Sequence, residues 1–253
     1  MKLTNAEVNQ FRKIGYISKL IFKDSECEFY KNNFEKVTKI CSKIPFENKS
    51  SDRIMNPHFF DETSKKILLN SNLFNYAKQL LNCEVYAVQT MFFERGSEQT
   101  FHQDDFYLNN TIGIWIALDD VNELNGSICV QMGSQKYDVI YPETIGINNS
   151  QDLKNEETYA DIMNSVYVHN KKNNELKDKI VKLKKGYAVI LDGRLIHWGL
   201  PVIDKEKKRR VIVNHYIDAK SKWPYINWPK YCSNGDYKVQ NNFDKMNLHP
   251  NKI

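Results

Sequence analysis

The sequence predicts a mainly β protein with flanking helices, folded as a double-sheet jelly roll. Apolar residues recur with a helical period as far as residue 83, and from Glu84 onward the period changes to the two-residue alternation of strands. Long connections between the strand-like runs are typical of two packed antiparallel sheets. The 253 residues suffice for one compact domain with a full core.

Amphipathic helices are expected before the strands begin. Thr4 offers an N-cap with an acidic residue three positions later, and an apolar stripe of helical period then ends at Gly15. Residues 25–41 and 61–81 carry further stripes of the same period. Between the strand-like runs 119–121 and 128–130, the pair Asn125-Gly126 predicts a β-hairpin.

We expect one domain, 1–253, with an internal organisation that follows these patterns. Residues 1–83 form a helical flank, 84–141 and 182–218 the jelly-roll core, and 219–253 an aromatic-rich tail that packs on the domain. Residues 142–181 turn polar and lose strand character, so we interpret them as an insertion over the mouth of the barrel. This insertion is either a lid that orders when substrate binds or a plain surface excursion.

His102, Asp104 and His197 are the candidate metal ligands. In an extended strand residues i and i+2 point to the same side, so His102 and Asp104 are expected to project together from one strand end. His197 follows the apolar run 187–191, which is typical of a buried strand that ends in a turn. Two imidazoles and one carboxylate can occupy one face of a ferrous ion and leave positions open for a co-substrate and dioxygen.

Arg209 is the candidate anion-binding residue. Strand-like alternation after the basic run 205–210 places Arg209 and His215 on one face and Arg210 on the other. A buried guanidinium is costly unless it meets an anion, and a bound carboxylate would pair with it bidentately. If Arg210 faces inward instead, it takes this role.

Other titratable residues near these motifs receive no catalytic role. Asp105 lies on the wrong side of a strand to share a metal with His102, so it is expected behind the ligands or exposed. His58 is expected to cap or pack. His215 is expected to pack between the sheets or to bond to a neighbouring strand.

These residues and their surroundings resemble the phytanoyl-CoA dioxygenase family of Fe(II)- and 2-oxoglutarate-dependent oxygenases. The resemblance begins with the helix-like segment Leu3 to Tyr16. It continues through the motifs Gln89-Thr90-Met91-Phe92-Phe93, His102-Gln103-Asp104-Asp105-Phe106-Tyr107, Trp115-Ile116-Ala117-Leu118-Asp119-Asp120, Asn125-Gly126-Ser127 and Gly133-Ser134, and ends at Gly186, His197 and Arg209.

The resemblance implies roles for these positions. His102, Asp104 and His197 become ligands of Fe(II), and Arg209 takes the far carboxylate of 2-oxoglutarate. The positions that match the family's co-substrate pocket are Gln89 and Trp115. The implied fold is the double-stranded β-helix, which is the jelly roll of cupin-like proteins, with helices outside one sheet.

The implied activity is that of a 2-oxoglutarate-dependent dioxygenase, a hydroxylase of an unactivated carbon in a small-molecule or natural-product substrate. O2 is consumed, and succinate and CO2 are released. Related halogenases carry a small residue in place of the carboxylate ligand, so Asp104 favours hydroxylation. No residue identifies the substrate.

Two other classes fit the same residues. A cupin-like zinc or manganese enzyme could use the three ligands, although it would have no need of a buried Arg209. A non-catalytic binding module on the same fold would be favoured if a ligand had been lost, and none has been.

Composition bounds the partners and the compartment. The net charge of +5 is spread over a chain rich in both signs, which argues against nucleic-acid binding and is compatible with an anionic small-molecule substrate. The five cysteines are far apart, so a reducing compartment is expected. A polar N-terminus and the lack of long apolar runs predict a cytoplasmic protein with no membrane contact. The oligomeric state is not predicted.

Overall fold

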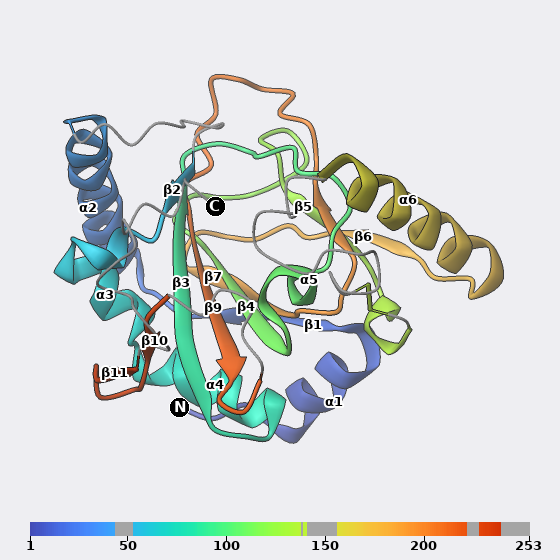
Figure 1. Ribbon diagram of the computed structural model, residues 1–253. Helices are drawn as coiled ribbons and strands as arrows, with labels where there is room; N and C mark the ends of the chain where they lie inside the picture. The colour runs from blue at the N-terminus through green and yellow to red at the C-terminus, as the bar shows by residue number, and fades with distance from the viewer. Residues whose placement is uncertain (44–52, 138, 141–155, 222–227, 239–253) are drawn as a thin grey trace.

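The computed structural model describes residues 1–43, 53–137, 139–140, 156–221 and 228–238. Its centre consists of two sheets, and the pairings between their strands in this part of the chain are antiparallel (Figure 1). The larger sheet has the order β1 (Tyr16–Leu20), β7 (Tyr187–Asp192), β4 (Thr111–Ala117), β9 (Val211–Asp218), β3 (Val85–Phe93), β10 (Lys230–Tyr231) and β11 (Tyr237–Lys238), with β2 (Arg53–Met55) also paired to β3. The smaller sheet has the order β6 (Asp178–Ile180), β5 (Ile128–Gln131) and β8 (His197–Gly199). The predicted jelly roll is confirmed.

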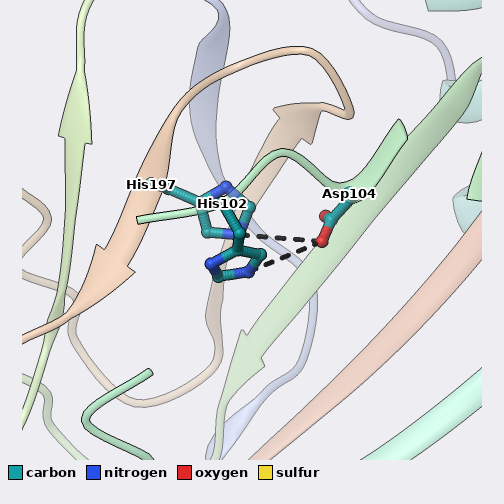
Figure 2. Close-up of side chains that lie close together, drawn as sticks. All are labelled: His102, Asp104 and His197. Carbon is teal, nitrogen blue, oxygen red and sulfur yellow. Dashed lines mark ion pairs between the residues drawn. The ribbon is translucent and has the colours of Figure 1, made fainter. Parts of the chain in front are cut away.

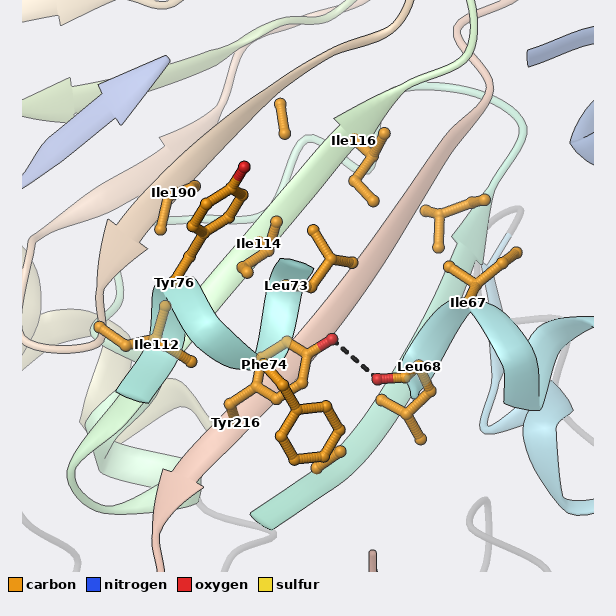
Figure 3. Close-up of a cluster of buried hydrophobic side chains, with 14 of the residues drawn as sticks. Ile67, Leu68, Leu73, Phe74, Tyr76, Ile112, Ile114, Ile116, Ile190 and Tyr216 are labelled. Carbon is orange, nitrogen blue, oxygen red and sulfur yellow. Dashed lines mark hydrogen bonds between the residues drawn. The ribbon is translucent and has the colours of Figure 1, made fainter. Parts of the chain in front are cut away.

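The large sheet separates two apolar layers, because alternate residues of its strands point to opposite faces. On β4, Ile112, Ile114 and Ile116 face the helices and pack with Leu73 and Phe74 (Figure 3). Trp115 and Ala117, which alternate with the isoleucines, face the smaller sheet and belong to a second buried cluster. The pocket described below lies on this inner side.

Helices cover the outer face of the large sheet. They are α1 (Asn5–Ile14), α2 (Asp24–Lys43), the 3-10 helix η1 (Pro57–Phe59), α3 (Glu62–Leu68) and α4 (Ser71–Leu81). The predicted start and end of α1 are confirmed, since Thr4 forms a capping box with Glu7 and Gly15 ends the helix at φ 87°. The single helix expected over 61–81 is two helices. Asn70 accepts hydrogen bonds from the backbone amides of Asn72 and Leu73, which starts a new helix.

The hairpin predicted at Asn125-Gly126 is wrong. β5 pairs with β6 and β8, whereas Val121 forms an isolated bridge with Leu183. Gly126 has φ 79°, but the side chain of Asn125 bonds to backbone groups of its own loop instead of closing a two-residue turn. The chain therefore passes from the large sheet to the small one here.

The predicted insertion and tail lie partly outside the described residues. Residues 142–155 are not described, and helix α6 (Glu156–Asn173) and strand β6 follow them. Residues 222–227 and 239–253 are not described either, and the strands β10 and β11 lie between them. The division into segments and the choice between a lid and a surface excursion therefore stay predictions.

Within the described ranges, no helix combines the length and the apolar character needed to span a membrane.

Candidate metal centre

Three segments bring the predicted ligands together. His102 and His197 form an isolated antiparallel bridge with two backbone hydrogen bonds of 3.0 Å. Asp104 is the first residue of the short helix α5 (Asp104–Leu108). The expectation that His102 and Asp104 share one strand is therefore wrong, because a helix begins at Asp104. The three side chains nevertheless converge, with their ligand atoms within 4.8 Å of one another (Figure 2).

The geometry leaves the ligand atoms available. Asp104 Oδ1 lies 3.8 Å from His102 Nε2 and 3.8 Å from His197 Nε2. His102 Nδ1 lies 2.8 Å from the carbonyl oxygen of Thr100, and His197 Nδ1 lies 3.0 Å from that of Leu195. A carbonyl only accepts hydrogen bonds, so each Nδ1 carries a proton, and a neutral ring would then present a lone pair at Nε2. This tautomer is the one that a metal requires at Nε2.

Burial and neighbouring charge set the protonation of the ligands. Burial lowers the pKa of His102 to about 3, with a further contribution from His197, so this imidazole is neutral at physiological pH. Burial opposes the ionisation of Asp104, but the imidazoles of His197 and His215 hold the pKa of that carboxyl below its usual range. Imidazole nitrogens beside an ionised carboxylate are the donor set that suits a divalent transition metal.

Arg209 lies in the wall of the same pocket and is 2% exposed. Its guanidinium donates one hydrogen bond to the carbonyl oxygen of Arg95, and its Cζ lies 5.0 Å from the centre of the Trp115 ring. The Nε has no partner, and no carboxylate of the described chain pairs with this cation. Burial lowers the pKa of Arg209 to about 9. Keeping the buried guanidinium charged therefore costs free energy, which a bound anion would offset.

Arg210 points the other way. Its Nε lies 2.8 Å and its Nη2 2.9 Å from the two carboxylate oxygens of Asp119. Arg209 therefore faces the pocket and Arg210 faces away from it, which is the first of the two arrangements that the sequence left open.

One cavity of about 720 Å³ connects these groups. Gln89 and Trp115 line it together with the three candidate ligands and Arg209. Aromatic side chains line it as well, and they are Phe93, Phe101, Tyr107, Tyr159, Trp198 and Trp228. The structure thus gathers the residues singled out in the sequence around one pocket.

Two further titratable residues near the candidate ligands, Asp105 and His215, have environments that the sequence did not predict. Asp105 is buried, accepts a hydrogen bond of 2.7 Å from the amide of Thr111, and has its pKa raised by burial to about 7. His215 is buried with its Nε2 3.3 Å from Asp104 Oδ2. The alternation after Arg209 placed His215 on the pocket face, but no pattern indicated which residue it would meet. His58 packs against Phe59 and Tyr231, as the packing interpretation expects.

Comparison with known proteins gives consistent matches. The family model described as phytanoyl-CoA dioxygenase (PhyH) matches residues 11–209. A phytanoyl-CoA dioxygenase domain-containing protein 1 homolog of Caenorhabditis elegans is 25% identical over 187 residues, which are 70% of this chain and 62% of that protein. Phytanoyl-CoA dioxygenase 1 of Oryza sativa subsp. japonica is 24% identical over 181 residues, which are 68% of this chain and 59% of that protein. The match spans about three fifths of each relative.

Solved structures share the fold. The non-heme α-ketoglutarate-dependent carbocyclase SnoK from nogalamycin biosynthesis superposes with a TM-score of 0.69 at 15% identity, over 87% of this chain and 86% of that one. EctD from S. alaskensis, solved with 2-oxoglutarate and 5-hydroxyectoine, gives a TM-score of 0.64 at 16% identity, over 88% and 79%. Identities this low establish the architecture only.

Proposed function

Because the chain belongs to the phytanoyl-CoA dioxygenase family of Fe(II)- and 2-oxoglutarate-dependent oxygenases, we propose that it is a 2-oxoglutarate-dependent dioxygenase that hydroxylates a small-molecule substrate. The metal site would be His102, Asp104 and His197, and Arg209 would anchor 2-oxoglutarate. Iron bound there would couple the oxidation of 2-oxoglutarate by O2, which yields succinate and CO2, to the transfer of one oxygen atom to a carbon of the substrate.

The observation that carries this proposal is a buried arginine without an anionic partner in the wall of the metal pocket. Arg209 is buried, lacks an anionic partner in the described chain, and shares the cavity with the three candidate ligands. A dicarboxylate whose one end binds the metal would offer its other end to this guanidinium. A zinc hydrolase or a simple binding module would leave the cost of burying Arg209 unexplained.

The protein's own part in this reaction is to position and to shield. Trp115 packs against the guanidinium of Arg209, and this contact fixes the direction in which the guanidinium presents its N–H groups. Gln89 would lie beside the co-substrate, as the family position implies. The aromatic residues Tyr107 and Trp198 would keep water from the oxidising site, because bulky apolar groups there leave little room for it.

Hydroxylation is proposed on the strength of Asp104. The carboxylate ligand is present, whereas related halogenases lack it. Among the structural neighbours, EctD was solved with a hydroxylated compound and SnoK is described as a carbocyclase, so the same fold serves more than one outcome. The substrate would be a small molecule that fits the 720 Å³ cavity beside the co-substrate.

Succinate formation tests this function without a known substrate. Protein supplied with ferrous iron, 2-oxoglutarate and oxygen should release succinate slowly even when no substrate is present. His102→Ala should reduce this rate to the background, because one of three metal ligands is lost. The control is His169→Ala, which removes an exposed imidazole on α6 and should leave the rate unchanged. Equal succinate from wild type and His102→Ala would contradict the proposed function.

A further inference from the structure

His215 lies beside the carboxylate oxygen of Asp104 that does not face His102 and His197. It lies on β9, six positions beyond Arg209, and pairs in register with Gly113 of β4 and Gln89 of β3. The residue is 2% exposed, and its Nε2 is 3.3 Å from Asp104 Oδ2. The two oxygens of Asp104 are thus divided, since Oδ1 faces His102 and His197 while Oδ2 faces His215.

Each of the other two candidate ligands is already held by a backbone carbonyl. His102 Nδ1 meets Thr100 and His197 Nδ1 meets Leu195, and both contacts fix the ring on the protein side. Asp104 has His215 as the corresponding partner. A metal site needs such outer contacts, because they hold a ligand in the orientation that binds the ion.

We propose that His215 is a positioning residue for the metal-binding carboxylate, donating its Nε2–H to Asp104 Oδ2 so that Oδ1 is the oxygen presented to iron. This proposal rests on the proposed function only in the identity of the metal. It assigns His215 no contact with the metal and no proton transfer.

The neighbouring strand leaves space for this pair. A Cβ added at Gly113 would lie 3.0 Å from Asp104 Oδ2 and 3.5 Å from two atoms of the His215 ring. A side chain at this position would crowd the contact, so the absence of one on β4 permits the carboxylate and the imidazole to approach.

A packing role alone accounts poorly for a histidine here. Its Nδ1 is buried and has no hydrogen-bond partner, and an unsatisfied buried nitrogen lowers the stability of the fold. An aliphatic residue would fill the space between β3 and β4 without that cost. The contact of Nε2 with Asp104 is the feature that an aliphatic residue lacks.

The test compares side chains that differ in reach. Glutamine can place an amide N–H near the position of Nε2, whereas asparagine is too short and leucine has no donor. Ferrous iron alone is titrated anaerobically into wild type and into His215→Gln, His215→Asn and His215→Leu, with folding checked by circular dichroism. The control is Tyr216→Phe, which removes a buried hydrogen bond to the Leu68 carbonyl from the opposite face of the same strand (Figure 3).

We expect His215→Asn and His215→Leu to weaken iron binding roughly 10- to 100-fold, as is usual for the loss of an outer contact of a metal ligand. His215→Gln should recover most of the affinity, and Tyr216→Phe should lower the melting temperature with iron affinity unchanged. Wild-type affinity in the asparagine variant, or equal losses in the glutamine and asparagine variants, would overturn the proposal. Because the titration uses the metal alone, a failure of 2-oxoglutarate binding would count against the proposed function and not against the role of His215.

Discussion

Among single residues, the directions of two adjacent arginines decide which of them can reach a bound anion. Arg209 enters the pocket, and Arg210 is paired with Asp119 at the periphery. Only one of them can therefore anchor an anion beside the metal. Lysine substitutions at the two positions form a matched pair, because the two arginines are adjacent in the chain and differ only in the groups that they contact.

Arg209→Lys should raise the Kd for 2-oxoglutarate, because an ammonium replaces a fork that binds a carboxylate bidentately. A charge-assisted hydrogen bond contributes about 1.5–3 kcal/mol, so the expected increase is roughly 10- to 100-fold. Iron affinity should stay as in the wild type, since Arg209 does not contact the ligands. The measurement is calorimetric titration of the iron-loaded protein with 2-oxoglutarate under anaerobic conditions.

Arg210→Lys is the control and should bind 2-oxoglutarate with the affinity of the wild type. If Arg210→Lys weakens binding while Arg209→Lys does not, the pocket has been assigned to the wrong arginine.

The clustering of the candidate metal ligands could be predicted from the sequence because residue type and order carry that information. His102, Asp104 and His197 were predicted as ligands, and the structure brings them together. The local conformation was mistaken, because the sequence pattern of His102 to Asp104 does not show that a helix starts at Asp104. The contact between His215 and Asp104 joins residues 111 positions apart, and such contacts depend on strand order, which local patterns do not contain.

At the scale of elements, helix α6 supports the metal-binding segment. The hydroxyl of Tyr159 accepts a hydrogen bond of 2.9 Å from the amide of Gln103, the residue between two candidate ligands. Its ring stacks on Phe106 at 3.7 Å between centroids. Further along the helix, Tyr167 stacks on Phe101, which precedes His102. Residues of the helix therefore form part of the pocket wall, and they also support the backbone that positions His102 and Asp104.

Tyr159→Phe should keep the ring stacking and leave the Gln103 amide without its acceptor. The expected cost is about 1–3 kcal/mol of stability, the usual range for an unsatisfied buried donor. Iron affinity should fall severalfold, because the backbone between the ligands loses a support. Thermal melting and iron titration measure the two effects.

The matched control for this helix is Tyr167→Phe. Its hydroxyl bonds to Asp178, away from the ligands, so its loss should affect stability alone. Equal effects of both substitutions on iron affinity would show that α6 does not act through Gln103.

A sign of α6 is present in the sequence, although its polar composition obscures it. The buried residues Tyr159, Met163 and Asn170, with the half-buried Val166 between them, are spaced four, three and four apart, which is a helical stripe. One of the four is an asparagine, and the side chain of Asn170 bonds to Gln131 on β5. Because a polar residue occupies a core position, the apolar periodicity there is weak.

For the whole molecule, the change of hydrophobic period after residue 83 predicted a helical flank followed by the strands of a jelly roll, and the family resemblance implied that the helices lie outside one sheet. Strand alternation also predicted that Arg209 and His215 share one face and Arg210 lies on the other, but it left open which face is interior. The passage from β4 to β5 was not predictable in the same way. Asn125-Gly126 has the composition of a tight turn, but the partners of β5 come from residues 178–180 and 197–199, and a local turn signal says nothing about them.

The fold holds two ends of one pocket in place, and we propose that a metal and a dicarboxylate occupy them together. β8, the residues before α5 and the first residue of α5 supply the candidate metal site, while Arg209 lies two residues before the start of β9. No single element contains the site, so its integrity depends on the packing of both sheets.

An anaerobic titration of the apoprotein with ferrous iron and then 2-oxoglutarate tests this claim most directly. The visible charge-transfer band of an iron–2-oxoglutarate chelate should appear in the wild type, and it should be absent in His102→Ala under the same conditions. A folded wild-type protein that binds metal but shows no band would contradict the account.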